Sequence, residues 1–151
     1  MIKIICTGKI KEKYLRDAIE EYSKRISKYT KLEIIEIPDF KSDNPSIEME
    51  KEKQSILKYI KEKEFIVTLE IEGKEFSSEE FATKIDNIFL NNSVITFIIG
   101  GSSGIHSDIK KMSDLKLSFS KMTFPHQLFR VLLLEQIYRS YKILNNESYH
   151  K

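Results

Sequence analysis

The chain has 151 residues, of which 40% are hydrophobic and 32% charged, a composition typical of one globular domain over residues 1–151 rather than of a disordered chain. Its net charge is +2. The sequence does not begin with a signal-peptide pattern, and no stretch approaches the roughly 20 apolar residues that a membrane span needs. Cys6 is the only cysteine, so it can form neither an internal disulfide nor a cysteine zinc cluster. We therefore expect a cytoplasmic protein with no membrane and no metal partner.

Short apolar, β-rich runs alternate with amphipathic helical patterns along the whole chain. Strands are predicted at Ile2–Cys6, Leu32–Ile37, Phe65–Ile71 (ended by Gly73), Val94–Ile99 and Lys116–Phe119. Helices are predicted at Lys11–Tyr29, from a cap at Asp43 or Ser46 to about Lys63, from a cap at Ser77 or Ser78 to Leu90, near Ile105–Met112, and from Pro125 to about Leu144. The alternation predicts an α/β fold in which helices cover both faces of a parallel sheet.

The first 31 residues are more basic than the rest of the chain. They carry nine basic side chains and only four acids, a local charge of +5. Such an excess is typical of proteins that bind a phosphate backbone, and the alternative is an ordinary solvated helix face. The basic residues are Lys3, Lys9, Lys11, Lys13, Arg16, Lys24, Arg25, Lys28 and Lys31.

Ligands of parallel sheets usually bind outside the carboxyl ends of the strands, which directs attention to the segments after Leu69, Ile99 and Phe119. The segment after Ile99 is the glycine-rich loop Gly100–Gly104, whose adjacent glycines allow a backbone to approach a ligand closely. It lacks the residues of a P-loop and the spacing of a dinucleotide fingerprint. A simple tight turn is the commoner meaning of such a loop, and a cofactor loop is the alternative.

The segment from Ser118 to His126 leads into the last helix, which we expect to begin at Pro125. Its backbone could offer amide and carbonyl groups to an adenine ring while Met122 and Phe124 sandwich that ring. The alternative is a structural connection that contributes two side chains to the core.

The last helix has more apolar surface than one sheet face can bury. Val131–Leu134 puts four large apolar groups on consecutive positions, which indicates a second contact surface and hence a homodimer. Arg130 and Arg139 lie in this apolar setting, together with Glu135. These charges form either structural ion pairs or contacts to a substrate.

The chain ends in Tyr149, His150 and Lys151, which could stack on a base, move a proton and hold a phosphate. The default alternative for a terminus is a frayed tail. His106, His126 and His150 lack zinc-binding spacing, and the sequence contains no serine nucleophile elbow.

Several of these segments together resemble the ribosomal RNA large subunit methyltransferase H family of the SPOUT superfamily. The resemblance covers essentially the whole chain. It rests on Thr7-Gly8-Lys9, Ile99-Gly100-Gly101 with Gly104, Leu117 through Arg130, Leu134 through Arg139, and Tyr149-His150-Lys151. Two departures are Ser102-Ser103 in the glycine loop and Ser148, where a proline is usual in the family.

The resemblance implies a SPOUT (alpha/beta knot) fold with a C-terminal trefoil knot that binds S-adenosyl-L-methionine (SAM). Dimerisation would place the tail of one subunit near the cofactor of the other. The implied product is N3-methylpseudouridine in 23S rRNA, made on assembled ribosomes. The implied cofactor contacts are Leu69, Gly101, Ser120, Lys121, Met122, Thr123, Phe124 and Pro125.

For the chemistry, His150 is the first candidate to help remove the N3 proton, with Tyr149 and His126 as less favoured ones. Arg130 and Arg139 are assigned to phosphate or carboxylate contacts, and Arg130 is predicted to be catalytic together with His150 and Tyr149. Three alternatives remain: a SPOUT enzyme that methylates another RNA such as tRNA, a non-catalytic RNA-binding ribosome-assembly protein, and a sensor of a small nucleotide.

Overall fold

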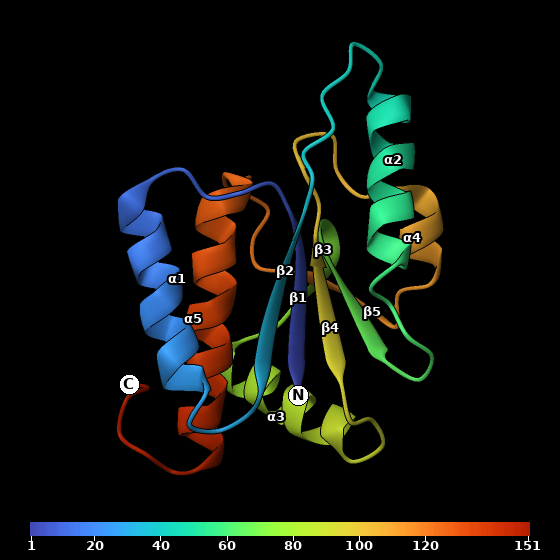
Figure 1. Cartoon of the computed structure of the whole chain (residues 1–151). Helices are drawn as coiled ribbons and strands as arrows, with labels where there is room; N and C mark the ends of the chain where they lie inside the picture. The colour runs from blue at the N-terminus through green and yellow to red at the C-terminus, as the bar shows by residue number, and fades with distance from the viewer.

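The computed structural model describes residues 1–151, and its centre is one five-stranded sheet (Figure 1). All four strand pairs are parallel, and the strand order is β2-β1-β4-β3-β5. The strands are β1 (Ile2–Thr7), β2 (Leu32–Ile37), β3 (Phe65–Glu75), β4 (Ile95–Ile99) and β5 (Leu115–Ser118). The helices are α1 (Lys13–Ile26), α2 (Pro45–Leu57), α3 (Ser78–Phe89), α4 (Ser107–Lys111) and α5 (His126–Leu144). The predicted α/β fold with a helix-covered parallel sheet is confirmed.

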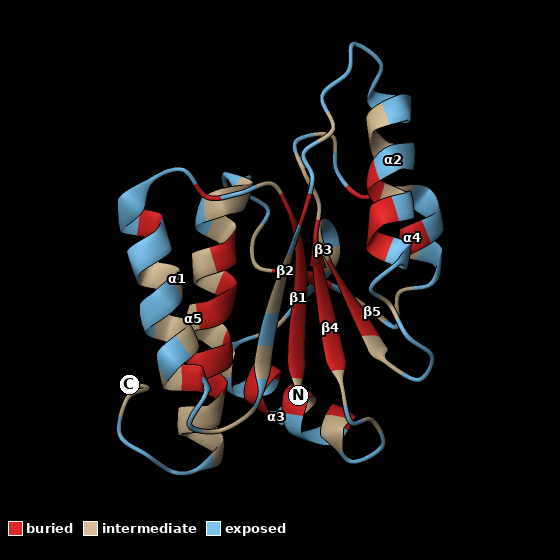
Figure 2. Cartoon of the chain, in the orientation of Figure 1, coloured by how far each residue is buried: buried red, intermediate tan, exposed pale blue.

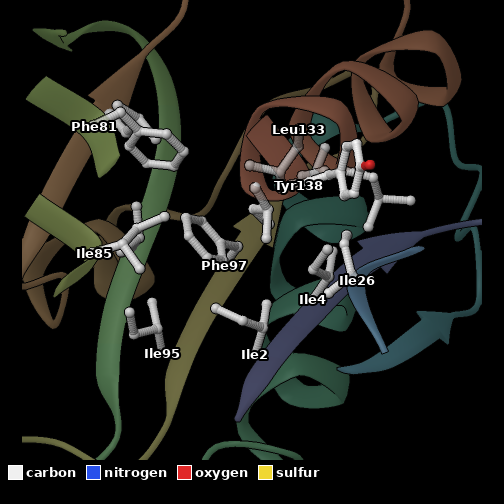
Figure 3. Packing of buried hydrophobic residues seen from close by; sticks show 14 of the residues in the cluster. Ile2, Ile4, Ile26, Phe81, Ile85, Ile95, Phe97, Leu133 and Tyr138 are labelled. Carbon is white, nitrogen blue, oxygen red and sulfur yellow. The ribbon is translucent and has the colours of Figure 1, made fainter. Parts of the chain in front are cut away.

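The two faces of the sheet are covered by different helices. Every residue of β1 is buried, and its side chains alternate between the faces: Ile4 belongs to the larger apolar cluster and Ile5 to the smaller one. The larger cluster has 16 buried residues and includes the inner faces of α3 and α5, whereas the smaller one has seven and lies under α2 and α4. Figure 2 shows the buried central strands between these layers, and Figure 3 shows the larger cluster around Phe97 and Leu133.

Most element boundaries agree with the sequence prediction to within two residues, and α1 ends three residues early. The exception among helices is α2, where both predicted ends are wrong. Its cap is Asn44, whose side chain accepts a hydrogen bond from the amide of Ser46, and Pro45 takes the first helical position. The helix ends at Leu57 instead of about Lys63, because the chain turns and Lys63 adopts a left-handed φ of 68°.

Strand β3 continues past the predicted stop at Gly73 to Glu75. Its pairing with β5 is irregular between Leu69 and Lys74, and a Cβ on Gly73 would lie 2.7 Å from the backbone of Lys116. Glycine therefore allows close approach of two strands here, where the sequence suggested a break.

Helix α5 begins at His126, with Pro125 as its cap instead of its first residue. It runs from the carboxyl edge of the sheet to the opposite edge, where the chain ends (Figure 1). None of the helices combines the length and apolar character required to cross a bilayer.

Candidate functional site

A cavity of about 490 Å³ opens at the carboxyl edge of the sheet. Its walls come from the middle of β3, from the ends of β4 and β5, from Lys110 of α4 and from the start of α5. The segments after Leu69, Ile99 and Phe119 thus surround one cavity, and ligand binding there stays a prediction. The three wall segments are residues 69–72, residues 99–105 without Ser103, and residues 117–129 without Lys121, Pro125, Gln127 and Leu128.

Most of the residues predicted to contact a cofactor line this cavity. They are Leu69, Gly101, Ser120, Met122, Thr123 and Phe124. Lys121 and Pro125 do not line the cavity and are exposed to solvent. The cofactor contacts themselves stay predictions for all eight residues.

The glycine loop forms a tight turn and also lines the cavity, and its role as a cofactor loop stays a prediction. The amide of Gly104 donates to the carbonyl of Gly101 at 3.0 Å, and Gly104 has a φ of +85°. A Cβ on Gly100 would lie 2.8 Å from Cγ1 of Ile105 and 2.9 Å from the backbone of Gly104. Glycine is required at Gly104 for its conformation and at Gly100 for space.

The loop between β5 and α5 is held by short hydrogen bonds within itself. The hydroxyl of Ser118 donates to the carbonyl of Ser120 at 3.0 Å, and the amide of Met122 donates to the hydroxyl of Ser120 at 3.0 Å. Met122 is 74% exposed although it lines the cavity, so its side chain is available to a ligand. Phe124 packs on Phe129 with ring centroids 6.1 Å apart. One side chain of the predicted adenine sandwich is thus anchored and the other is free.

Sequence reasoning missed several polar residues of the cavity. Glu70 and Glu72 directly follow Leu69 at the end of the predicted strand, so their position alone could have indicated them. The hydroxyl of Thr68 donates to Glu70 at 2.6 Å, and the amine of Lys110 lies 3.6 Å from the same carboxylate. Lys110 comes from α4, and no local pattern in the sequence assigns it to the site.

His126 lies in the cavity wall at the start of α5. Burial lowers the pKa of its imidazole, the Asp39 carboxylate raises it, and the Arg130 guanidinium lowers it further. The net shift is downward, so the neutral form of His126 predominates at neutral pH and can accept a proton.

Arg130 lies behind the cavity and is only 2% exposed. Its Nη1 donates to the Glu36 carboxylate at 2.7 Å, and its Nη2 donates to the carbonyls of Thr7 and Gly8 at 3.4 and 3.1 Å. It is absent from the cavity lining. These contacts support the structural ion pair over the substrate contact, and the catalytic assignment of Arg130 stays a prediction.

The C-terminal tail folds back on α5 instead of fraying. The Tyr149 hydroxyl donates to Oε1 of Glu135 at 3.0 Å, and the same oxygen accepts from Arg139 at 2.6 Å. The Arg139 guanidinium also lies 4.7 Å from the centre of the Tyr149 ring. Burial raises the pKa of Tyr149 to about 12, with further contributions from Glu135, so its hydroxyl is protonated at neutral pH.

His150 is held on both sides of its ring. Nδ1 lies 3.1 Å from Nη1 of Arg139, and Nε2 lies 2.6 Å from Oε1 of Glu79 at the start of α3. Because the guanidinium can only donate, Nδ1 accepts from it and Nε2 carries the proton that Glu79 accepts. The His150 hydrogen bonds pull the pKa of Glu79 below its usual range.

The structure does not bring this tail into the cavity of the same chain. His126 and Arg139 are separated by about 20 Å along the axis of α5, and Figure 1 places the chain end near the amino-terminal edge of the sheet. Neither Tyr149 nor His150 lines the cavity.

The basic start of the chain is mostly on the surface, with one exception. Lys3 is 4% exposed and pairs with Glu64, so it does not belong to the basic surface. Lys13 and Arg25 pair with acids one turn away on α1, which reduces their net field. The remaining surface cations are Lys9, Lys11, Arg16, Lys24, Lys28 and Lys31.

Comparisons with known proteins agree with this geometry. A family model described as "Predicted SPOUT methyltransferase" matches residues 1–150. A protein of Methanococcus maripaludis, provisionally named a ribosomal RNA large subunit methyltransferase H, is 60% identical over 157 aligned residues covering 99% of both chains. The ribosomal RNA large subunit methyltransferase H of Clostridium botulinum (strain 657 / Type Ba4) is 55% identical with the same coverage. A probable methylase family protein from Haemophilus influenzae Rd KW20 superposes with a TM-score of 0.57 at 10% identity, covering 99% of this chain and 70% of that one, a likeness of fold alone.

Proposed function

Because the chain belongs to the SPOUT methyltransferase family, we propose that it methylates large-subunit ribosomal RNA with SAM as the methyl donor. The observation that carries this proposal is the identity of 55% or more to relatives of that activity over 99% of both chains. The cavity supports it, because two of its wall segments, residues 99–105 and 117–129, contain motifs on which the resemblance to the family rests. We further infer that residues 1–151 form one cytoplasmic SPOUT domain with the trefoil knot in its C-terminal part.

The cavity fits SAM in size and in chemistry. Its volume of about 490 Å³ lies in the usual range of ligand sites, roughly 300–1,000 Å³. Leu69, Met122 and Phe124 would contact the adenine ring, and the backbone of Gly101 and of the loop from Ser120 to Pro125 would bind its polar edge. When bound, SAM supplies a methyl group that its sulfonium already activates. The protein then has to hold the acceptor nitrogen in line with that methyl group.

We propose N3 of a pseudouridine in 23S rRNA on assembled ribosomes as the acceptor. This follows from the resemblance of the glycine loop, the loop before α5 and the tail to the family. The basic surface of α1 would contact ribosomal RNA phosphates, and Arg139 would face the same partner. SPOUT enzymes that methylate tRNA are the nearest alternative.

The active unit would be a homodimer. One chain keeps its cavity and its tail at opposite ends of α5, so a tail that acts on the cofactor must come from a second copy. Apolar side chains that remain accessible near the cavity support such contact: Met122 is 74% and Leu128 39% exposed. Val131 and Leu132 are only partly buried, as expected for a surface that a partner covers.

His150 is the proposed acceptor of the N3 proton. Its Nε2 already carries the proton that Glu79 accepts, so the incoming base must replace Arg139 at Nδ1 before His150 can take the N3 proton. Tyr149 is less suited, because its raised pKa keeps the hydroxyl protonated. His126 is neutral and already in the cavity, which makes it the second candidate.

The test is methyl transfer from labelled SAM to ribosomes that lack the modification, with free ribosomal RNA and tRNA in parallel reactions. We expect label at one pseudouridine, on ribosomes only. Label on tRNA would overturn the proposed substrate and keep the fold family. SAM binding without any transfer would mean a cofactor-binding protein with a different target, and absence of SAM binding would favour the non-catalytic RNA-binding protein.

A further inference from the structure

Glu70 is a charged side chain of the cavity wall that a buried partner holds in place. It lies on β3 directly after Leu69, and 12% of its side chain is exposed. The hydroxyl of Thr68, which is fully buried, donates to Oε2 of Glu70 at 2.6 Å and lies 2.8 Å from the hydroxyl of Ser113. The carboxylate therefore has a fixed position at the cavity.

The other oxygen of this carboxylate is available to a ligand. Oε1 of Glu70 lies 3.6 Å from Nζ of Lys110, a separation longer than a hydrogen bond. An ionised carboxylate accepts hydrogen bonds and donates none. The group that would complete the contacts of Glu70 is therefore a donor on the ligand.

The charge of Lys110 limits which donor fits. Its ammonium group lies close enough to Oε1 to compensate the charge of Glu70, and it repels a second cation at the same place. A neutral hydroxyl group meets no such repulsion and gains a charge-assisted hydrogen bond. The local charges therefore favour an alcohol over an ammonium group as the partner of Glu70.

The place of Glu70 in the wall indicates which hydroxyl groups these are. Leu69 precedes it in the strand, and Met122 and Phe124 line the same cavity. These three apolar side chains are the ones proposed to contact the adenine ring. Adenine is bonded directly to ribose in SAM, and successive residues of a strand are about 3.3 Å apart. A residue next to the adenine contacts is thus well placed for the ribose.

We propose that Glu70 binds the ribose hydroxyls of the cofactor through Oε1, while Thr68 orients the carboxylate and Lys110 compensates its charge. The inference rests on the proposed function, because it assumes that the cavity binds SAM. Dinucleotide-binding folds match a carboxylate with ribose hydroxyls in the same way. The cavity should therefore distinguish ligands by these hydroxyls, and the distinction should depend on Glu70.

The experiment is calorimetry of the full chain with two ligands, S-adenosylhomocysteine and its 2′,3′-dideoxy analogue. S-adenosylhomocysteine keeps the nucleoside and the amino acid of SAM, and the analogue lacks only the two ribose hydroxyls. The test variant is Glu70→Gln, and the control is Glu75→Gln. Glu75 lies on the same strand, is exposed and does not line the cavity, so its replacement makes the same change in net charge.

The wild type should bind S-adenosylhomocysteine at least about tenfold more tightly than the dideoxy analogue. Glu70→Gln should bind S-adenosylhomocysteine about tenfold more weakly than the wild type does, and the analogue within about twofold of it, because only the first ligand has the hydroxyls. Glu75→Gln should match the wild type with both ligands. Thermal melting of each variant verifies that weaker binding is not unfolding.

An equal loss of affinity for both ligands in Glu70→Gln would overturn the inference and assign Glu70 to another part of the cofactor or to the structure of the wall. An unchanged affinity of Glu70→Gln for S-adenosylhomocysteine, or a wild type that binds both ligands equally, would overturn it as well. If Glu70→Gln did not fold, Glu70→Asp would replace it, with a smaller loss that is again confined to S-adenosylhomocysteine. Absence of SAM binding to the wild type would instead overturn the proposed function, so the two failures are distinguishable.

Discussion

The cavity at the start of α5 and the C-terminal tail at its end contain different kinds of residues. At its start, the cavity wall consists mostly of glycines, small polar residues and apolar side chains, with the charged residues Glu70, Glu72 and Lys110 on one part of it. At its end, the tail is held by charged side chains, with Glu135 accepting hydrogen bonds from Arg139 and from Tyr149. Glycines and apolar side chains let a ligand lie close against the wall, whereas a connected group of charged side chains at the tail suits proton transfer.

This difference implies a division of labour within one chain. Changes at the cavity end should alter SAM affinity, and changes at the tail should alter turnover. About 20 Å of helix separates the two ends, so they would act together only in the homodimer proposed above. Variants at the two ends should therefore change different quantities, SAM affinity at the cavity and turnover at the tail.

The largest effect is expected for His150→Ala. Loss of a proton acceptor lowers the rate of methyl transfer by about 100- to 10,000-fold, while SAM affinity stays within about twofold. The measurements are single-turnover methylation of ribosomes and calorimetry, with Lys151→Ala as the neighbouring control. If affinity and rate fell together, His150 would be structural and His126 would become the first candidate for the proton.

Arg130→Met tests whether a residue at the cavity end can be purely structural. Removing the guanidinium leaves the Glu36 carboxylate and two backbone carbonyls without their donor, which should lower the free energy of unfolding by about 3–5 kcal/mol. Chemical denaturation measures this loss. Turnover of the folded variant should stay near that of the wild type, and a fall of more than about 100-fold would restore the catalytic role predicted from the sequence.

The fold was largely predictable because buried parallel strands carry continuous apolar runs. Ile2–Thr7 and Ile95–Ile99 are buried throughout, and their patterns located them almost to the residue. Prediction was wrong where the local signal had two meanings. Gly73 read as a stop, but its missing Cβ allows β3 to approach β5 closely.

The site was predictable to the extent that it lies at strand ends. Leu69, Gly101 and most of the loop before α5 were expected in the wall and lie there. Lys110 was missed because α4 brings it beside Glu70 of β3, 40 residues earlier in the chain, and a single sequence contains no signal for such a contact. Lys3 illustrates the same limit: its charge counted toward the basic start, but Glu64 binds it inside the protein.

Gly100→Ala tests whether SAM binding needs the open space at Gly100 in the cavity wall. Its new Cβ would lie 2.9 Å from the backbone of Gly104, which cannot move without opening the loop. We expect SAM affinity to fall by roughly 10- to 100-fold, the equivalent of an overpacked site. Gly104→Ala is the control for conformation alone, since no atom lies within 4 Å of its Cβ position. If calorimetry gave both variants the same loss, backbone strain and not space would dominate.

Glu52 of α2 is only 5% exposed, and Glu52→Gln should measure the cost of burying its carboxylate near the cavity end. The folded state raises the pKa of Glu52 to about 7, above its unfolded value, so the folded protein binds more protons and loses stability as the pH rises from about 4.5 to 7. The variant lacks this loss and should be more stable than the wild type at pH 8, by roughly 1–3 kcal/mol, with no difference below pH 4.5. Denaturation at several pH values measures it. A variant that is less stable at pH 8 would mean that the carboxylate supports packing.

The smallest effect is expected for Tyr149→Phe, and it decides what the tail does. The ring keeps its contact with Arg139, and Glu135 keeps its hydrogen bonds from the same guanidinium, so only the bond of the hydroxyl is lost. That bond is worth about 0.5–1.5 kcal/mol, which corresponds to a fall in turnover of no more than about tenfold. Single-turnover methylation beside His150→Ala makes the comparison direct. A fall as large as that of His150→Ala would mean that Tyr149 itself takes part in proton transfer, which its pKa of about 12 opposes. A small fall leaves Tyr149 as the residue that holds the tail in place for its neighbour.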